Sequence, residues 1–459
     1  MSSLNASLAT ALSGLKADQG ALEATSNNVA NINTPGYSRE VPVLVTSDPV
    51  VEDPLTFGSG VTLQSIESIR DPILESQIQQ ETQTQGQLNT LVSALQQAQV
   101  NFTSNTGADI GTQVSSFFSS VNQLATNPSD LSLRQGVLTA ADNLATSFNV
   151  AANQLTSQQT SLDNNVVQTV NQINQLTGQI AQLNGQIGEL QNAGESAGTF
   201  LDQRQEAIDQ LSSLVDVSVI PSDNTLTLTT ASGTALVAGQ QSFQLSTQQN
   251  SAGLQDVFAQ GVDITSTIVS GQLGGLLQAR DRQIPAIQSQ LDTLAAGLAN
   301  AVNGVQTAGF DLNGKPGTNL FNPPPANGTG AAASLSVAIT DPSLIAASSD
   351  ATAGNNANAD AMYALANQSI IAGQSPSSYY SSIIFNVGNA TSQATAEQSA
   401  SNQALQQLND QRSAISGVSL DQEAANMIQY QQAYQASAQV ITTINDMMYA
   451  VINMTTLTG

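Results

Sequence analysis

The sequence contains no cysteine, no histidine and no tryptophan among its 459 residues. Without cysteine the chain has no disulfide, no thiol nucleophile and no thiolate ligand for zinc or iron. Without histidine it lacks the side chain that most often serves as a general base or a metal ligand. The composition therefore makes an enzyme the weakest hypothesis, and we expect no catalytic residue, no cofactor and no metal ion.

Charged residues are also scarce. Asp, Glu, Lys and Arg make up only 9% of the chain, against roughly a quarter in ordinary globular proteins. Acidic residues outnumber basic ones by 34 to 9, for a formal net charge of -25. Binding to nucleic acid or to an anionic membrane requires clustered Lys and Arg, so we expect neither partner. The polar surface must consist mainly of Ser, Thr, Asn and Gln.

The chain has no long apolar run either. No segment approaches the ~20 consecutive apolar residues of a membrane-spanning helix. The segment Met1 to Gly20 has no basic n-region, since Lys16 is the first cation, and its apolar residues are spaced apart. This start does not resemble a cleavable signal peptide, so a protein that leaves the cell would need another export route.

Both ends of the chain carry apolar residues at every seventh position, the repeat of a coiled-coil helix. At the N-terminus these residues are Leu8, Leu15, Leu22 and Val29. At the C-terminus they are Leu420, Met427, Tyr434, Ile441 and Met448. We call both sets together the assembly seam. Because a narrow apolar stripe needs a partner helix, we predict that the terminal helices pair with each other or with neighbouring copies.

Further helices are predicted between the two ends. Their approximate ranges are 72–100, 110–126, 130–190, 201–215, 273–307 and 390–413. Residues 216–268 alternate apolar and polar positions over short stretches separated by turn signals, which predicts a small antiparallel β subdomain. Residues 309–360 are rich in Gly, Pro, Asn and Ala, and we predict mostly loop there.

The predicted fold class is mainly α. It combines a discontinuous helical bundle or coiled coil of the paired N- and C-terminal helices with a core of long helices and the small antiparallel β subdomain. The predicted domains are a terminal-helix domain (1–40 and 417–459), a helical core (41–215 and 269–416) and the β subdomain (216–268). Gly178, Gly185 and Gly188 each weaken a helix by up to ~1 kcal/mol relative to Ala, yet the apolar spacing continues to Leu190.

Two acidic motifs have both a functional and a structural interpretation. Asp202 and Glu206 share a helix face, as an acid–base pair or a cation site would. Since Arg204 lies in the same turn, a solvated face with an ion pair is the better interpretation. Asp311-Leu-Asn-Gly314 looks like half of a calcium loop, but Asn322 stands where the twelfth-position Glu is required. A tight Asx turn is the better interpretation.

A distinctive motif follows the N-terminal seam. The segment Asn27-Asn-Val-Ala-Asn-Ile-Asn-Thr-Pro-Gly-Tyr-Ser-Arg39 resembles the N-terminal signature of flagellar axial proteins, which are the rod, hook and hook-associated subunits. Residues 416–440 are similar to the C-terminal counterpart of that signature. The axial residues that we single out within the signature are Asn28, Asn31, Asn33, Pro35, Gly36 and Tyr37.

The Tyr-Ser-Arg sequence after Gly36 is typical of the hook–filament junction family. Three internal stretches are similar to blocks of that family: 200–204 with 214–217, 271–277 with 280–281, and 341–345 with 355–356. The chain departs from the family at Gln306, where histidine is common. It also passes almost directly from Phe321 to Leu335, so 309–360 would be the loop-rich remnant of a variable outer domain.

The resemblance implies a structural subunit that flagellar type III secretion exports to the extracellular flagellum. It implies a homo-oligomeric ring at the distal hook, with hook protein below and a second junction protein and the filament above. A cytoplasmic export chaperone would bind the C-terminal segment.

Two other hypotheses remain open. Another axial subunit, such as hook, distal rod or the second junction protein, would carry the same terminal motifs. A secreted fibre or adhesin would account for seven-residue repeats at both ends, but not for the Asn-Thr-Pro-Gly-Tyr signature.

Overall fold

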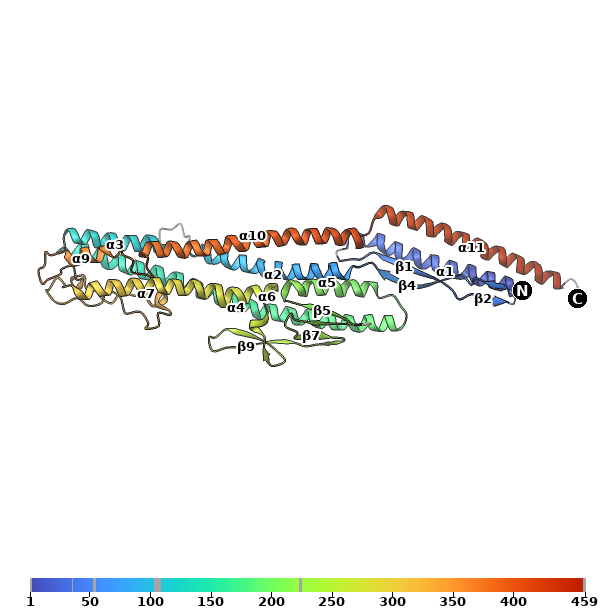
Figure 1. The fold of residues 1–459 in the computed structure, drawn as a ribbon, viewed down its shortest axis with the longest axis horizontal. Helices are drawn as coiled ribbons and strands as arrows, with labels where there is room; N and C mark the ends of the chain where they lie inside the picture. Colours follow the sequence, from blue (N-terminus) through green and yellow to red (C-terminus); the bar gives the residue numbers. More distant parts are fainter. Residues whose placement is uncertain (1, 35, 53–54, 103–108, 223–224, 457–459) are drawn as a thin grey trace.

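The computed structural model describes residues 2–34, 36–52, 55–102, 109–222 and 225–456. The molecule is a long rod of helices, and both ends of the chain lie at the same end of the rod (Figure 1). The helices α1 (Ser2–Ala30) and α11 (Leu420–Thr456) form that end. The predicted mainly α fold with a small antiparallel β subdomain is confirmed.

Long helices form the rest of the rod. They are α2 (Pro72–Val100), α3 (Ile110–Thr126), α4 (Leu131–Asn192), α5 (Gly198–Leu214), α7 (Ile284–Ala308) and α10 (Pro376–Ser416). Several begin at an acidic cap: Asp71, for example, accepts hydrogen bonds from the backbone N–H groups of Ile73 and Leu74 at the start of α2. The predicted helix at 130–190 is continuous over 62 residues despite its glycines, because Ile173, Ile180 and other apolar side chains along it are fully buried.

The predicted helix at 273–307 is divided in two. α6 (Gly271–Gln278) is joined to α7 by a π-helical turn, Ala279–Gln283. The turn carries Arg280, whose fully buried guanidinium donates to Asp163 at 2.7 Å and to the Gln255 carbonyl at 2.6 Å. These bonds tie the helical core to the β subdomain.

The β subdomain covers one side of α4 with two small antiparallel sheets. The first sheet has the order β5–β6–β7–β8 and the second the order β11–β10–β9. Their strands are β5 (Ser218–Ser222), β6 (Thr225–Thr229), β7 (Ala235–Ala238), β8 (Gln241–Ser242), β9 (Leu245–Gln249), β10 (Gln255–Ala259) and β11 (Val262–Asp263). These strands lie between residues 218 and 263, within the range of 216–268 predicted for the subdomain.

One hairpin of strands was missed in the sequence, and one helix begins earlier than predicted. An antiparallel hairpin of β1 (Glu40–Thr46) and β4 (Val61–Ser68), extended by β2 (Val50–Glu52) and β3 (Leu55–Phe57), packs against α1. The helix predicted at 390–413 begins earlier, at Pro376, where Ser375 caps it. Buried Tyr380, Ile383 and Val387 hold this additional first part in the core.

Residues 309–360 are mostly loop, as predicted, with the short helical segments α8 (Ala331–Ser334) and η3 (Pro342–Leu344); α9 (Ala357–Ala364) follows. Side-chain amides of α7 hold the loop at two points. Asn303 exchanges two hydrogen bonds of 2.9 Å with the backbone of Phe321. Gln306 donates to the Leu344 carbonyl and accepts from the Ala346 N–H, at 3.0 and 3.1 Å.

The Asx-turn interpretation of 311–314 is confirmed. One carboxylate oxygen of Asp311 accepts hydrogen bonds of 2.8 Å from the backbone N–H groups of Asn313 and Lys315. The carboxylate therefore closes a turn of its own chain, as Asp and Asn side chains commonly do.

Candidate assembly site

The two terminal helices pack against each other in antiparallel orientation, so that the start of α11 meets the end of α1. The most buried apolar side chains of α1 are small: Ala17, Ala21 and Ala24 are at most 2% exposed. A Cβ added at Gly14 would lie 3.4 Å from the Ser437 hydroxyl of α11. Small side chains thus let the two helix backbones approach closely.

The residues of the assembly seam lie on both helices of this pair but are not fully buried. Leu8, Leu15, Leu22, Val29, Met427, Ile441 and Met448 are half-buried, whereas Leu420 is 54% and Tyr434 36% exposed. The most buried apolar residue of α11 is Ile444, at 4%, which lies three residues after Ile441 of the seam and is not itself a seam residue. The single molecule therefore leaves much of the seam accessible, and its role in assembly stays a prediction.

α11 also exposes large apolar side chains beside the contact with α1. We call this set the α11 flank. Its members are Leu420, Ile428, Tyr434, Val440, Met447, Tyr449, Val451 and Ile452, each at least 36% exposed. A helix that belonged only to a two-helix pair would carry polar residues at these flanking positions. The pattern instead indicates that further helices pack against α11.

A buried polar cluster joins the helix pair to the core. We call it the clasp: Asn28, Tyr37, Arg39, Glu40 and Glu423. Asn28 is only 1% exposed. Its amide nitrogen donates to the Glu40 carbonyl at 2.8 Å and to the Glu423 carboxylate at 3.2 Å. Its amide oxygen accepts from the Glu40 N–H and the Tyr37 hydroxyl, both at 2.8 Å. This one amide uses its full hydrogen-bonding capacity.

An ion pair and two backbone bonds complete the clasp. The guanidinium of Arg39 lies 2.7 Å from the carboxylate of Glu423, which is only 1% exposed. The Arg39 N–H donates to the Ser416 carbonyl at the end of α10, and the Arg39 carbonyl accepts from Ile69, each at 2.9 Å. Three distant parts of the chain are therefore fixed at one point between the terminal helices and the core.

Burial, together with neighbouring carboxylates, keeps the Tyr37 hydroxyl protonated. Burial, followed by the carboxylates of Glu40, Asp202 and Glu423, raises the pKa of Tyr37 well above its usual value. The hydroxyl therefore remains a hydrogen-bond donor to Asn28 throughout the physiological range.

The prediction that Arg204 forms an ion pair with acidic residues in its own turn of α5 was wrong. Asp202 pairs with Arg70, which precedes α2, and accepts from the Ser38 N–H at 3.3 Å. Burial still raises the pKa of Asp202, although Arg70 offsets part of that effect. Arg204 instead donates to Asn184 at 2.9 Å. Asp202 thus supports the clasp from the core side and is not part of a solvated face.

The other axial residues shape the turn after α1. Asn31 donates to the carbonyl of Asn27 at 3.0 Å, and its side-chain oxygen accepts from the Thr34 hydroxyl at 3.1 Å. Gly36 has a φ of +77°, and a Cβ there would lie 3.1 Å from a carboxylate oxygen of Glu206. Asn33 is exposed. Pro35 lies outside the described residues.

Sequence reasoning singled out Asn28 and Tyr37 but not the acidic half of the clasp. The burial of Glu423 cannot be read from the sequence, since it depends on contact with a segment 395 residues away. The described ranges contain no cluster of three or more Asp, Glu, His or Cys side chains placed to hold a metal ion. None of the helices in this part of the chain is long and apolar enough to span a membrane.

Comparison with protein-family models gives three matches. The helical domain of flagellar hook-associated protein FlgK matches residues 95–321. The flagella basal body rod protein model matches residues 8–37, and the C-terminal model of flagellar basal body rod FlgEFG proteins matches residues 410–454. The two rod-type matches therefore cover most of the terminal helices and three residues of the clasp, Asn28, Tyr37 and Glu423.

Full-length relatives agree with these matches. Flagellar hook-associated protein 1 of Bacillus subtilis is 30% identical over 500 residues, covering 99% of each chain. The Escherichia coli protein of the same name is 28% identical over 543 residues, covering 97% of this chain and 98% of its own. The solved flagellar hook junction protein FlgK from Burkholderia pseudomallei superposes with a TM-score of 0.67 at 19% identity, over 74% of this chain and all of that chain.

Proposed function

Because this chain belongs to the family of flagellar hook-associated protein 1, or FlgK, we propose that it is the adapter at the junction of hook and filament. Members of this family are structural proteins of the flagellum. In the proposal, flagellar type III secretion exports the chain, and its copies assemble outside the cell as a ring at the distal hook. Hook protein lies below the ring, and a second junction protein and the filament lie above it.

The observation that carries this proposal is the α11 flank. Large apolar side chains remain exposed along a helix that already has one partner, α1. Each such side chain contributes ~1.5–3 kcal/mol when it is buried, so association of several copies around the terminal helices is strongly favoured. The assembly seam and the axial residues would act together there. The seam supplies apolar contacts, and the clasp sets the angle between the helix pair and the core.

The same exposed flank explains why an export chaperone would be needed. Before assembly, apolar residues such as Ile428 and Tyr449 would promote aggregation in the cytoplasm. We propose that the chaperone covers this C-terminal segment until export. The loop-rich 309–360 segment would be the remnant of an outer domain. Alignments of 543 and 546 residues with enterobacterial relatives, against 459 residues here, support that view.

Deleting the gene in the source bacterium tests the proposal. We expect cells that build hooks but no filaments and that release filament subunits into the medium, because nothing joins the two structures. The wild-type gene should restore filaments, and a gene lacking residues 418–459 should not. Cells without hooks would indicate a rod or hook subunit instead, and normal filaments on the deletion strain would contradict an axial role altogether.

A further inference from the structure

The helical core has two grooves on opposite sides. α3 packs against α4 and α10, and α7 packs against the same two helices. The groove between α3 and α10 is therefore opposite the groove between α4 and α7. In Figure 1, α10 and α7 run along opposite edges of this part of the rod. A neighbouring molecule at either side would meet a different surface.

A prominent aromatic side chain stands at the edge of the first groove. Phe385 of α10 is 67% exposed. The groove is lined by Ser115 and Ser119 of α3 and by Ser381 and Ile384 of α10. Since Ser381 and Phe385 are four residues apart, they share a helix face. An exposed phenyl ring is costly in water, so this position favours a protein partner.

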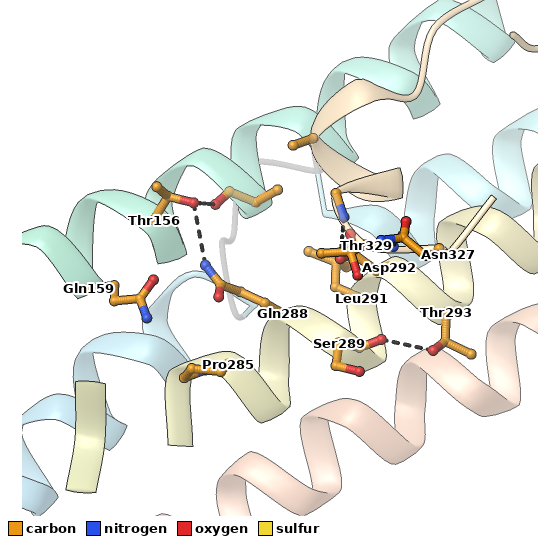
Figure 2. Close-up of a pocket in the computed structure, with 14 residues that line it drawn as sticks. Thr156, Gln159, Pro285, Gln288, Ser289, Leu291, Asp292, Thr293, Asn327 and Thr329 are labelled. Atoms are coloured by element: carbon orange, nitrogen blue, oxygen red, sulfur yellow. Dashed lines mark hydrogen bonds between the residues drawn. The ribbon is translucent and has the colours of Figure 1, made fainter. Parts of the chain in front are cut away.

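The second groove contains a pocket of about 460 Å³ (Figure 2). Pro285 of α7 and, to a small extent, Ala152 of α4 supply apolar surface, and the fully buried Leu291 lies beneath them. Thr156 and Gln288 supply neutral polar groups joined by a hydrogen bond of 3.3 Å. The charged side chain among the lining residues is Asp292. Its carboxylate already accepts from the N–H groups of Gly330 and Ala332, at 2.8 and 2.9 Å. The pocket therefore suits an uncharged ring.

Each groove has one charged lining residue, Asp109 in the first and Asp292 in the second. Residues 110–126, 143–162 and 376–396 contain no Asp, Glu, Lys or Arg, and α7 contains Asp292 alone. Copies of a chain with a net charge of -25 repel one another wherever their acidic residues meet. Weakly charged faces on opposite sides are the surfaces through which such copies can approach.

The aromatic side chain and the pocket lie at similar heights along the rod. Two hydrogen bonds to α2 serve as reference points along the rod. Gln398 of α10 donates to the Asn89 side chain, and Gln158 of α4 donates to the Ala94 carbonyl. Counting along these antiparallel helices places Phe385 within about two helical turns, ~10 Å, of the pocket. Two molecules side by side can therefore bring the two together without a large axial shift.

We propose that Phe385 of one copy inserts into the α4–α7 pocket of the next copy. The proposal rests on the ring inferred above and names its lateral contact in the core. Because the inserted residue and the pocket are different surfaces, the contact is heterologous. Such a contact continues from copy to copy instead of stopping at a dimer, and it forms a ring when the rotation between copies closes.

Engineered cysteines test this contact, since the chain has none of its own. Ser381 and Ser289 are both exposed; Ser381 is next to Phe385, and Ser289 lines the pocket. A full-length S289C/S381C variant replaces the protein in the source bacterium, and isolated flagella are treated with a short bis-maleimide cross-linker. Denaturing gels should show a ladder that extends beyond the dimer. Each single-cysteine variant should give at most about one tenth of the cross-linked product.

Phe385 itself is tested on the same background. F385S should lower the cross-linked fraction at least about fivefold, whereas V262S should not, although Val262 in the β subdomain is similarly exposed at 64%. The inference is wrong if the double-cysteine variant enters flagella that grow normal filaments but gives no ladder, or only dimers. Absence of the wild-type protein from isolated flagella would contradict the proposed function itself.

Discussion

Asn28 illustrates how a single side chain can be required by its hydrogen-bonding capacity. It donates to Glu40 and Glu423 and accepts from Glu40 and Tyr37 while almost fully buried. An aspartate there would place a second carboxylate against Glu423, and an alanine would leave several buried groups without partners. Buried groups that lose a partner cost about 1–3 kcal/mol each. The clasp therefore explains why this position of the axial signature carries an amide.

At the same scale, Arg39 is the cation that neutralises Glu423 inside the clasp. Substituting one partner of a buried ion pair leaves an uncompensated charge and costs about 3–5 kcal/mol. We expect R39Q to lower the opening free energy of the first turns of α11 by about that amount. Hydrogen exchange of amides 420–430, measured by mass spectrometry on the full-length subunit, reports that opening.

The R39Q/E423Q double variant should recover most of the loss, because two amides can hydrogen-bond without a buried charge. R282Q is the matched control, since Arg282 is exposed. The ion pair has no role in docking α11 if R39Q exchanges like the wild type, or if the double variant is no better than the single one.

Asp216, where α5 leads into the β subdomain, is a second residue with a measurable effect. It is 1% exposed, and burial raises its pKa to about 6, while the backbone of Ala231 offsets only part of that effect. A carboxyl group with a raised folded-state pKa adds stability below its unfolded value of 3.8, and this stability is lost as the pH rises through 6. We expect the free energy of unfolding to fall by about 3 kcal/mol across this window on account of Asp216.

Burial also raises the pKa of Asp209 to about 6, so D216N should remove roughly half of the part of the slope that these two carboxyl groups produce. Urea unfolding at several pH values between 4 and 7 measures this slope of the free energy of unfolding against pH. D341N is the control: bonds from Ser343 lower the pKa of Asp341, which therefore titrates below this window. An unchanged slope in D216N would show that Asp216 is not the source of the pH dependence.

At the scale of elements, hydrogen bonds of side-chain amides connect the helices to strands and loops. Other proteins often use charged side chains for such connections. Asn174 of α4 exchanges two hydrogen bonds of 2.8 Å with the backbone of Leu245 at the start of β9. Asn303 does the same for Phe321, and Gln306 for the loop between Leu344 and Ala346. An amide offers both a donor and an acceptor, as a strand neighbour does. The glutamine at position 306 thus meets a structural requirement of the loop.

The helices could be predicted because their signals are local. α2 and α3 have the predicted bounds, since Asp71-Pro72 and the apolar spacing mark them directly. The β1–β4 hairpin escaped prediction because β1 is only partly buried and contains Pro42, which is disfavoured within strands. The first half of α10 is rich in serine, and tertiary burial of Tyr380 and Ile383 decides its conformation.

Part of the candidate site could likewise be predicted from the sequence, and part of it could not. A seven-residue repeat can be read from the sequence, so the helix pair was predicted. The partners of Asn28 and Arg39 come from β1 and from the start of α11, and only the fold brings these together. Neither spacing nor composition indicates that Glu423 is buried, because its neighbours in sequence are exposed.

At the scale of the whole molecule, the rod has a well-packed helical core and a terminal pair with little apolar burial. α4 buries Leu144, Phe148 and Leu155 completely, whereas the buried apolar residues of α1 are alanines. Ordering each residue of a helix costs ~1–2 kcal/mol of backbone entropy. An isolated pair that buries mainly alanine offsets this cost poorly. Contacts of the α11 flank with other copies would supply the missing stabilisation.

The central claim is that contacts between copies stabilise the terminal helices. Hydrogen exchange of these helices, compared between the purified full-length subunit and isolated flagella, tests it most directly. Amides within 2–30 and 420–456 should exchange at least roughly a hundredfold faster in the free subunit, the equivalent of losing one or two buried side chains at ~1.5–3 kcal/mol each. Amides of α4 should be protected to the same degree in both samples. Terminal helices that are equally protected in the free subunit and in flagella would contradict the account.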